Sequence, residues 1–184
     1  MFTLILPQNR PHHQTHLARM FADRAKADPR FDAASDGPES VYIVYEDKKR
    51  NLFGSCRVNP LRQSLLRRVD LVDERACDTL KLMEVSCIVF DEDGVLDADP
   101  NKALHVRWFY EGLAIMLETL SVSLSLKGFF CVSSPEVHER CTQLGAWHFV
   151  SPIVVPSPED QIPLHAGFLV FDQTNTLAAT QPVF

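Results

Sequence analysis

One segment, residues 82–91, constrains the fold of this chain more than any other. It reads Leu-Met-Glu-Val-Ser-Cys-Ile-Val-Phe-Asp, an apolar run with β-branched residues. The run ends at Asp91, Asp93 and Gly94, which are residue types common in turns. A run of this length between turn residues predicts a buried central strand.

The acid inside this strand is the first candidate site residue. A buried carboxylate costs free energy unless it has a partner or a chemical role, which makes Glu84 a candidate for catalysis. The alternative is an acid at a strand end that reaches solvent. Strict alternation assigns the residues to two faces, with Glu84, Ser86, Ile88 and Phe90 on one and Val85, Cys87 and Val89 on the other.

Strand and helix patterns alternate along the rest of the chain. Strands are expected at 1–6, 41–46, 52–58, 129–133, 147–155 and 167–171, and helices at 15–27, 100–127 and 135–144. This order predicts an α/β fold with a mixed central sheet flanked by helices. The right-handed crossover rule makes 82–90 and 129–133 adjacent parallel strands, which we expect to diverge at one end. That succession is typical of the GNAT-like acyltransferase fold, in which a thioester enters between these two strands.

Length and charge exclude several classes of protein. The 184 residues fit one domain, expected at 1–172 with a loose tail at 173–184. A formal charge of −6 argues against nucleic-acid binding, since no basic excess would release counterions. The longest apolar stretch is broken by Glu118 and serines, and no signal peptide is evident, so we expect a cytoplasmic protein without a membrane span.

Cysteine and histidine patterns give no metal prediction. The five cysteines lack CxxC spacing, which indicates reduced thiols rather than a zinc site or a disulfide framework. His12, His13 and His16 have no carboxylate or cysteine nearby in the sequence, so a structural or exposed role is expected.

Four motifs occur in order and together resemble one family. They are Phe21 and Arg24 followed by Phe31-Asp32; Gly54-Ser55-Cys56-Arg57-Val58-Asn59-Pro60; Glu84-Val85-Ser86-Cys87-Ile88-Val89; and the Ser134–Trp147 segment containing Glu139-Arg140, followed by the 167–171 strand. This series resembles the acyl-homoserine-lactone synthases, or LuxI-type autoinducer synthases, over most of the chain. The family makes quorum-sensing signals by transferring an acyl group from acyl carrier protein to the amino group of S-adenosylmethionine.

The resemblance implies a catalytic role for two residues of the central strand. Glu84 would be the base that takes the ammonium proton, and a bulge near Ser86 and Cys87 would offer N–H groups to the oxyanion. Arg57 would hold a carboxylate or orient the acidic loop, and its alternative is an ion pair with Asp32 or Glu84 that only stabilises the fold.

The resemblance also implies a set of substrate-binding residues. Ser133 and Ser134 lie where the family senses the acyl substituent, although Ser134 equally suits a helix N-cap. An acyl tunnel would use Trp108, Met116, Phe129, Phe130 and Trp147, which would otherwise form the core. The full expected set is Phe21, Arg24, Asp32, Arg57, Cys87, Ser133, Ser134 and Trp147.

Departures from the family motifs leave two functions open. Leu17, Ala27, Pro29 and Cys87 replace residues that the family uses around its substrates, so the chain is expected to be a poor synthase of ordinary lactones. One interpretation is an N-acyltransferase acting on S-adenosylmethionine or another small amine. The other is an inactive relative that binds an acyl ligand or acyl carrier protein.

The turn after the central strand bears on the acyl donor. Residues 91–94, Asp-Glu-Asp-Gly, are too acidic to cradle a pyrophosphate, which favours acyl carrier protein over acyl-CoA as donor and partner. No cofactor is expected besides the thioester and, for one interpretation, S-adenosylmethionine as substrates.

Overall fold

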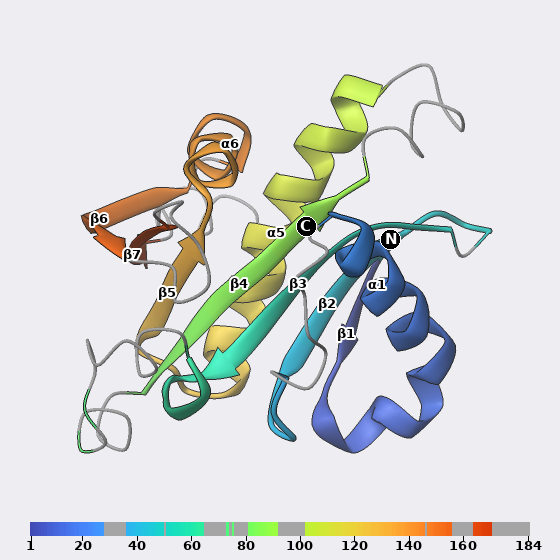
Figure 1. Cartoon of the computed structure of the whole chain (residues 1–184), viewed down its shortest axis with the longest axis horizontal. Coiled ribbons are helices and arrows are strands. Elements are labelled where there is room, and N and C mark those ends of the chain that lie inside the picture. The colour runs from blue at the N-terminus through green and yellow to red at the C-terminus, as the bar shows by residue number, and fades with distance from the viewer. Residues whose placement is uncertain are drawn as a thin grey trace, which may run out of the picture.

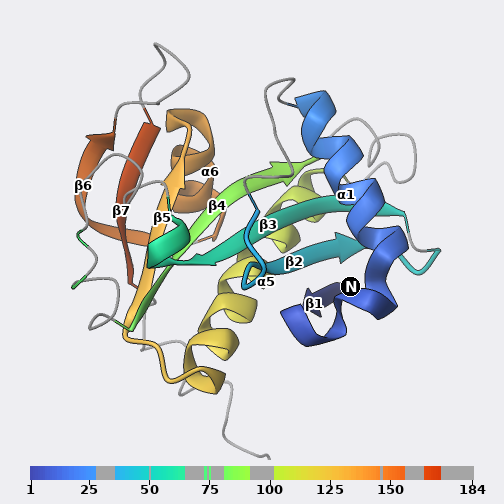
Figure 2. The same cartoon turned by 60° about the horizontal axis from the view of Figure 1, so that its bottom comes forward.

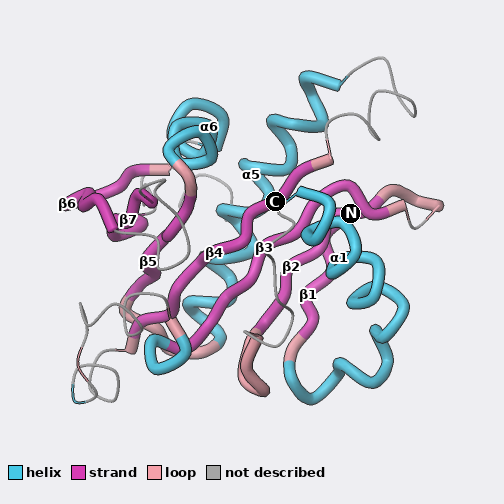
Figure 3. The backbone as a smooth tube through the Cα atoms, viewed as in Figure 1, coloured by secondary structure: helices cyan, strands magenta, loops and turns pink. Residues whose placement is uncertain are grey.

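Seven strands of the described part of the chain form one mixed sheet in the order β1-β2-β3-β4-β5-β7-β6. The computed structural model describes residues 1–27, 36–49, 51–64, 73, 75, 81–91, 102–145, 147–155 and 164–170. The strands are β1 (Phe2–Ile5), β2 (Val41–Glu46), β3 (Leu52–Pro60), β4 (Leu82–Phe90), β5 (Gly128–Ser133), β6 (His148–Val155) and β7 (Leu164–Val170). Figure 3 shows β6 and β7 turned away from β1–β3, as expected of a twisted sheet.

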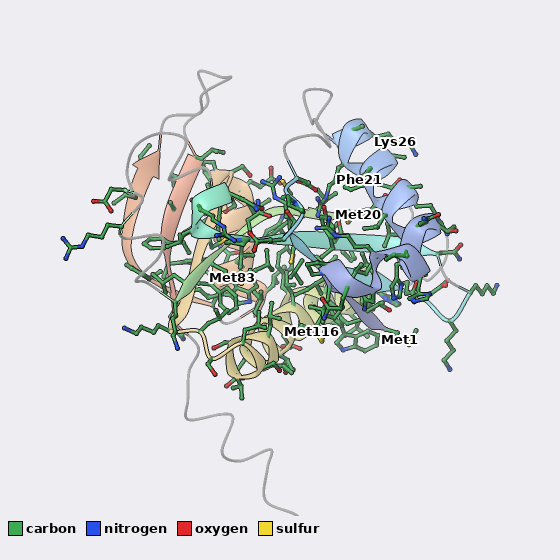
Figure 4. All side chains as sticks on the ribbon, turned by 90° about the horizontal axis from the view of Figure 1, so that it is seen from below. Met1, Met20, Phe21, Lys26, Met83 and Met116 are labelled. Atoms are coloured by element: carbon green, nitrogen blue, oxygen red, sulfur yellow. The ribbon has the colours of Figure 1, made fainter. Side chains whose placement is uncertain are left out.

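Helices cover both faces of this sheet, which confirms the predicted architecture. The helical elements are η1 (Pro7–His13), α1 (Gln14–Ala27), η3 (Leu61–Gln63), α5 (Lys102–Ser123) and α6 (Pro135–Gly145). Figure 2 shows α1 on one face and α5 on the other. In Figure 4 the labels of Met20 and Phe21 lie with α1 above the sheet, and that of Met116 lies with α5 below it.

Alternation along β2 explains why one sheet supports two apolar layers. Tyr42 and Val44 pack with Met20 of α1, whereas Ile43 and Tyr45 belong to the larger core that includes Phe109 of α5. All six residues of β2 are buried, as expected for a strand covered on both sides.

The parallel pair predicted from the crossover rule is present, and its strands separate. Register partners run from Leu82 opposite Gly128 to Val85 opposite Cys131. Beyond this point β4 continues to Phe90 and β5 to Ser133 with no further pairing between them. Figure 1 shows the two strands side by side at their amino ends and apart at their carboxyl ends.

A β-bulge in β4 changes which side chains share a face. Ser86 pairs with Arg57 and Val89 with Ser55, so two residues of β4, Cys87 and Ile88, stand opposite one residue of β3. Cys87 has a φ of 51°, in the left-handed region.

The prediction of strict alternation along this strand is therefore wrong beyond Ser86. Ile88 packs in the same core cluster as Val85, and Phe90 packs against that cluster, instead of both sharing the face of Glu84 and Ser86. The reason is the extra residue at the bulge, which rotates every later side chain to the opposite face.

Other differences from the expected elements are local. Pro7–His13 forms a 3-10 helix where the prolines predicted irregular chain, and β7 begins at Leu164 instead of 167. Trp108, expected in the core or an acyl tunnel, is 49% exposed, whereas Phe129 and Trp147 are buried. The expected tail at 173–184, the loop residue Asp32 and the helix start at 99–100 lie outside the described residues.

Candidate active site

The polar residues of β3 and β4 form two lateral rows on the face of the sheet that α1 covers. Antiparallel register places Arg57 opposite Ser86 and Asn59 opposite Glu84. Side chains directly opposite each other on one face have Cβ atoms about 4.5–5.5 Å apart. We call Arg57, Asn59, Glu84 and Ser86 the β3–β4 polar cluster. On the side of β4 that faces β5, no described residue beyond Val85 has a register partner on β5. The cluster therefore lies where the two parallel strands separate.

Asp36 is the anion that organises the charged side of this cluster. Its Oδ1 atom accepts a short hydrogen bond from Arg57 Nη1. Its Oδ2 atom accepts a hydrogen bond of 2.9 Å from the Tyr42 hydroxyl and lies 3.6 Å from Arg24 Nη1. The Asp36 side chain is 3% exposed, so these contacts are made almost without solvent.

Two arginines are consequently held in place around one carboxylate. Arg24 is 1% exposed, donates from Nε to Ser55 Oγ at 3.4 Å and lies 5.6 Å from the centre of the Tyr42 ring. Arg57 donates from Nε and Nη2 to Ser86 Oγ at 3.3 and 3.2 Å. Burial disfavours the charged guanidinium, but Cys87, Asp36 and Glu84 outweigh this and raise the pKa of Arg57. Arg57 is a fixed cation under all ordinary conditions.

Glu84 and Asn59 form the second row. Both residues are 0% exposed, and the row continues across β5 to Phe130 and across β7 to Phe168. The alternative for Glu84, an acid reaching solvent at a strand end, does not hold. The site therefore changes from polar to aromatic along one lateral line of the sheet.

The bulge expected near Ser86 and Cys87 is present. Cys87, its first residue, lies next to Ser86 and is partly exposed. β5 has already separated from β4 at this point, since β4 has no register partner on β5 beyond Val85.

The remaining expected site residues divide into two groups. Phe21 of α1 packs edge-on against Tyr42, with ring centres 5.9 Å apart, beside the Arg24 and Asp36 contacts. Ser133, Ser134 and Trp147 are outside the β3–β4 polar cluster. Ser134 caps α6 through a 3.3 Å bond from the Val137 N–H to its Oγ atom. Trp147 is 1% exposed and donates from Nε1 to the Tyr110 carbonyl at 3.2 Å.

The structure adds site residues that the sequence analysis missed. Asp36 lies four residues after Asp32, the residue that the motif indicates. Tyr42 lies inside a predicted strand, and Asn59 directly follows another. A period-two count from Arg57 places Asn59 on the same face, and this signal alone was available in the sequence.

No group of three or more His, Cys, Asp or Glu side chains in the described ranges is arranged to hold a metal ion. His16 instead contacts Glu46, with 2.9 Å between Nε2 and Oε2. The described helices include none that is both long and apolar enough to cross a membrane.

Comparison with known proteins confirms the GNAT-like acyltransferase fold expected from the element order, and the structural likeness to acyl-homoserine-lactone synthases expected from the motifs. No family model and no curated protein sequence matches the chain. Among solved structures, the CoA-dependent acyl-homoserine lactone synthase BjaI, determined with SAM and isopentyl-CoA, superposes with a TM-score of 0.66 at 15% identity, over 96% of this chain and 86% of that one. A second CoA-dependent acyl-homoserine lactone synthase, MesI, gives 0.61 at 18% identity, over 92% and 88%. FeeM, an N-acyl amino acid synthase from uncultured soil microbes, gives 0.59 at 17% identity, over 93% and 94%.

Proposed function

We propose that this protein is an N-acyltransferase that moves an acyl group from a thioester to the primary amine of a small molecule. One observation carries the proposal: the buried Glu84 carboxylate lies beside the β4 bulge at the point where β4 and β5 separate. This observation supports the proposal because a general base and backbone N–H groups on one strand could both act on a thioester carbonyl bound between the strands.

The reaction assigns a role to each part of the site. Glu84 takes a proton from the bound ammonium, directly or through water, and the amine nitrogen attacks the thioester carbonyl carbon. The N–H groups at the bulge stabilise the oxyanion of the tetrahedral intermediate, and Ser86, held by Arg57, fixes the strand beside it. Attack forms the C–N bond. Collapse of the intermediate restores the carbonyl and breaks the C–S bond, and the departing thiolate takes up the proton that the attacking nitrogen loses.

The donor is a thioester of acyl carrier protein or of CoA. The acidic sequence of residues 91–94 favours the carrier protein, whereas BjaI and MesI are CoA-dependent. Both donors therefore belong in the assay.

The test is a transfer assay with purified protein, both types of donor in several chain lengths, and a panel of primary amines. Thiol release and the mass of the new amide are measured together. Glu84→Gln preserves shape but removes the base, and we expect kcat to fall about 10²–10⁴-fold. Glu111→Gln, an exposed acid that pairs with Arg107 on α5, is the matched control and should retain full activity.

Two results would overturn the proposal. One is the absence of an amide with every donor and amine, with saturable binding of an acyl thioester alone, which would favour the non-catalytic alternative. The other is undiminished transfer by Glu84→Gln.

A further inference from the structure

Asn59 is a buried side chain whose hydrogen-bonding capacity is not used. The residue is 0% exposed, and neither its Nδ2 nor its Oδ1 atom has a hydrogen-bond partner among the residues that the structure describes. A buried amide without partners is strongly unfavourable, and such groups are rare in folded proteins unless a ligand or water completes them. Asn59 lies directly opposite Glu84 and two residues from Arg57 on the same strand face, within the proposed active site.

The asparagine amide suits a ligand that both donates and accepts hydrogen bonds. Its Oδ1 atom accepts from an N–H group, and its Nδ2 atom donates to an oxygen. Beside it, Glu84 carries a carboxylate that attracts an ammonium. Arg57, which already binds Asp36 and Ser86, adds a cation that attracts a second carboxylate. The order Arg57, Asn59, Glu84 therefore matches a ligand whose carboxylate and ammonium groups are both attached to one carbon atom.

The other end of the same row is apolar. Phe130 of β5 lies next to Glu84 in register, and its ring centre is 3.8 Å from that of Phe168, which is 37% exposed. An aromatic pair beside the amine-binding position suits an apolar or aromatic substituent on the ligand.

We infer that the acyl acceptor is a free α-amino acid with an apolar or aromatic side chain, and that Asn59 is the residue that selects it over an amine lacking the carboxylate. In this arrangement Asn59 Oδ1 accepts from the ammonium and Nδ2 donates to the carboxylate. The inference rests on the proposed N-acyltransferase function and names its acceptor.

The test compares phenylalanine with phenethylamine, which differ only in the carboxylate. The wild-type protein should prefer phenylalanine by about 10- to 100-fold in kcat/KM, the effect of one or two buried hydrogen bonds to a charged group. Asn59→Asp keeps the acceptor for the ammonium but places a second negative charge against the carboxylate. We expect it to lower or reverse the preference by at least about tenfold, chiefly through the acceptor KM, with the thioester KM unchanged.

Two controls distinguish a change in acceptor preference from a general effect of the substitution on the protein. Gln8→Glu adds the same charge at an exposed position of η1 and should leave the preference unaltered. Binding of phenylalanine and phenethylamine without thioester, measured by titration calorimetry on wild type and Asn59→Asp, gives a readout that does not depend on turnover.

The outcomes distinguish this inference from the proposed function. Transfer to both amines with equal efficiency, unchanged in Asn59→Asp, would overturn the inference and leave the acyltransferase function standing. Transfer to no amine would overturn the function. In that case equal binding of the two compounds in calorimetry would overturn the inference as well, and preferential binding of phenylalanine that is lost in Asn59→Asp would support it.

Discussion

Arg57 of β3 lies directly opposite Ser86 of β4 and donates two hydrogen bonds, of 3.3 and 3.2 Å, to the Ser86 Oγ atom. The same guanidinium binds Asp36, from the segment that follows α1. One side chain therefore connects the strand that carries the bulge with a segment 50 positions earlier in the chain. The geometry of the proposed site depends on this connection, and so does the stability of the fold.

The first prediction concerns the carboxylate between the two arginines. Asp36→Ala leaves the buried Arg24 and Arg57 charges without their shared anion, so we expect the free energy of unfolding to fall by about 3–5 kcal/mol. Urea denaturation measures this directly. Asp23→Ala is the control, because Asp23 forms a solvent-exposed pair with Lys26 at 3.8 Å, and its loss should cost less than about 1 kcal/mol. Equal effects of the two variants would show that the Asp36 contacts contribute little.

The second prediction is a loss of stability at high pH. Burial, together with the Asp36 charge and hydrogen bond, raises the pKa of Tyr42 to about 12. Between pH 10 and 12 the unfolded chain releases this proton while the folded protein keeps it. The unfolded state then binds fewer protons, so stability falls as pH rises, by about 1.4 kcal/mol per pH unit, until the folded pKa is passed.

Tyr42→Phe tests this assignment. The variant should be less stable than wild type at pH 8, by about 1–3 kcal/mol, because the bond to Asp36 is lost. Its stability should decline less steeply than that of wild type between pH 10 and 12, as followed by urea midpoints. Parallel curves for the two proteins would assign the alkaline loss to other groups.

The sequence predicted the β4–β5 pair well because the physical signals there are local. A β-branched apolar run, a helical stretch and a second apolar run leave few topologies once the crossover hand is fixed. The structure has these strands parallel, adjacent and diverging, with pairing limited to Leu82–Val85 and Gly128–Cys131.

Two features depend on long-range contacts that no local pattern encodes. The position of β7 between β5 and β6 follows from pairing of Leu164–Val170 with both neighbours, which a chain order alone does not specify. The role of Asp36 likewise arises from residues 12 positions before it and 21 after it, Arg24 and Arg57. Its neighbours in the sequence give only turn signals.

The third prediction separates the two roles considered for Ser134. Its Oγ atom accepts from the Val137 N–H, which is an N-cap contact. Ser134→Ala should therefore lower the free energy of unfolding by about 0.5–2 kcal/mol, and Ser134→Asp, which keeps a capping oxygen, should change it by less than about 0.5 kcal/mol. Thermal or urea unfolding measures both. If Ser134→Asp keeps stability but changes the preferred acyl chain length in the transfer assay, the residue also contacts the acyl group.

The last prediction is that this protein makes ordinary acyl-homoserine lactones slowly. Leu17 stands at the position where the synthases that this chain resembles have an arginine. It packs against the apolar cluster that contains Met20 and carries no charge. Cys87 occupies the bulge where the same family has another arginine, and its thiol cannot replace a guanidinium fork. Losing two charge-assisted contacts of about 1.5–3 kcal/mol each corresponds to roughly two to four orders of magnitude in rate if they act independently.

The assay supplies S-adenosylmethionine with acyl carrier protein and CoA thioesters and measures lactone and methylthioadenosine beside a known synthase such as BjaI. Turnover within about tenfold of that enzyme would show that Leu17 and Cys87 are tolerated. It would also favour S-adenosylmethionine over a free amino acid with an apolar side chain as the acceptor. Fast turnover would mean that the buried acceptor site accommodates the larger sulfonium substrate without a loss of rate.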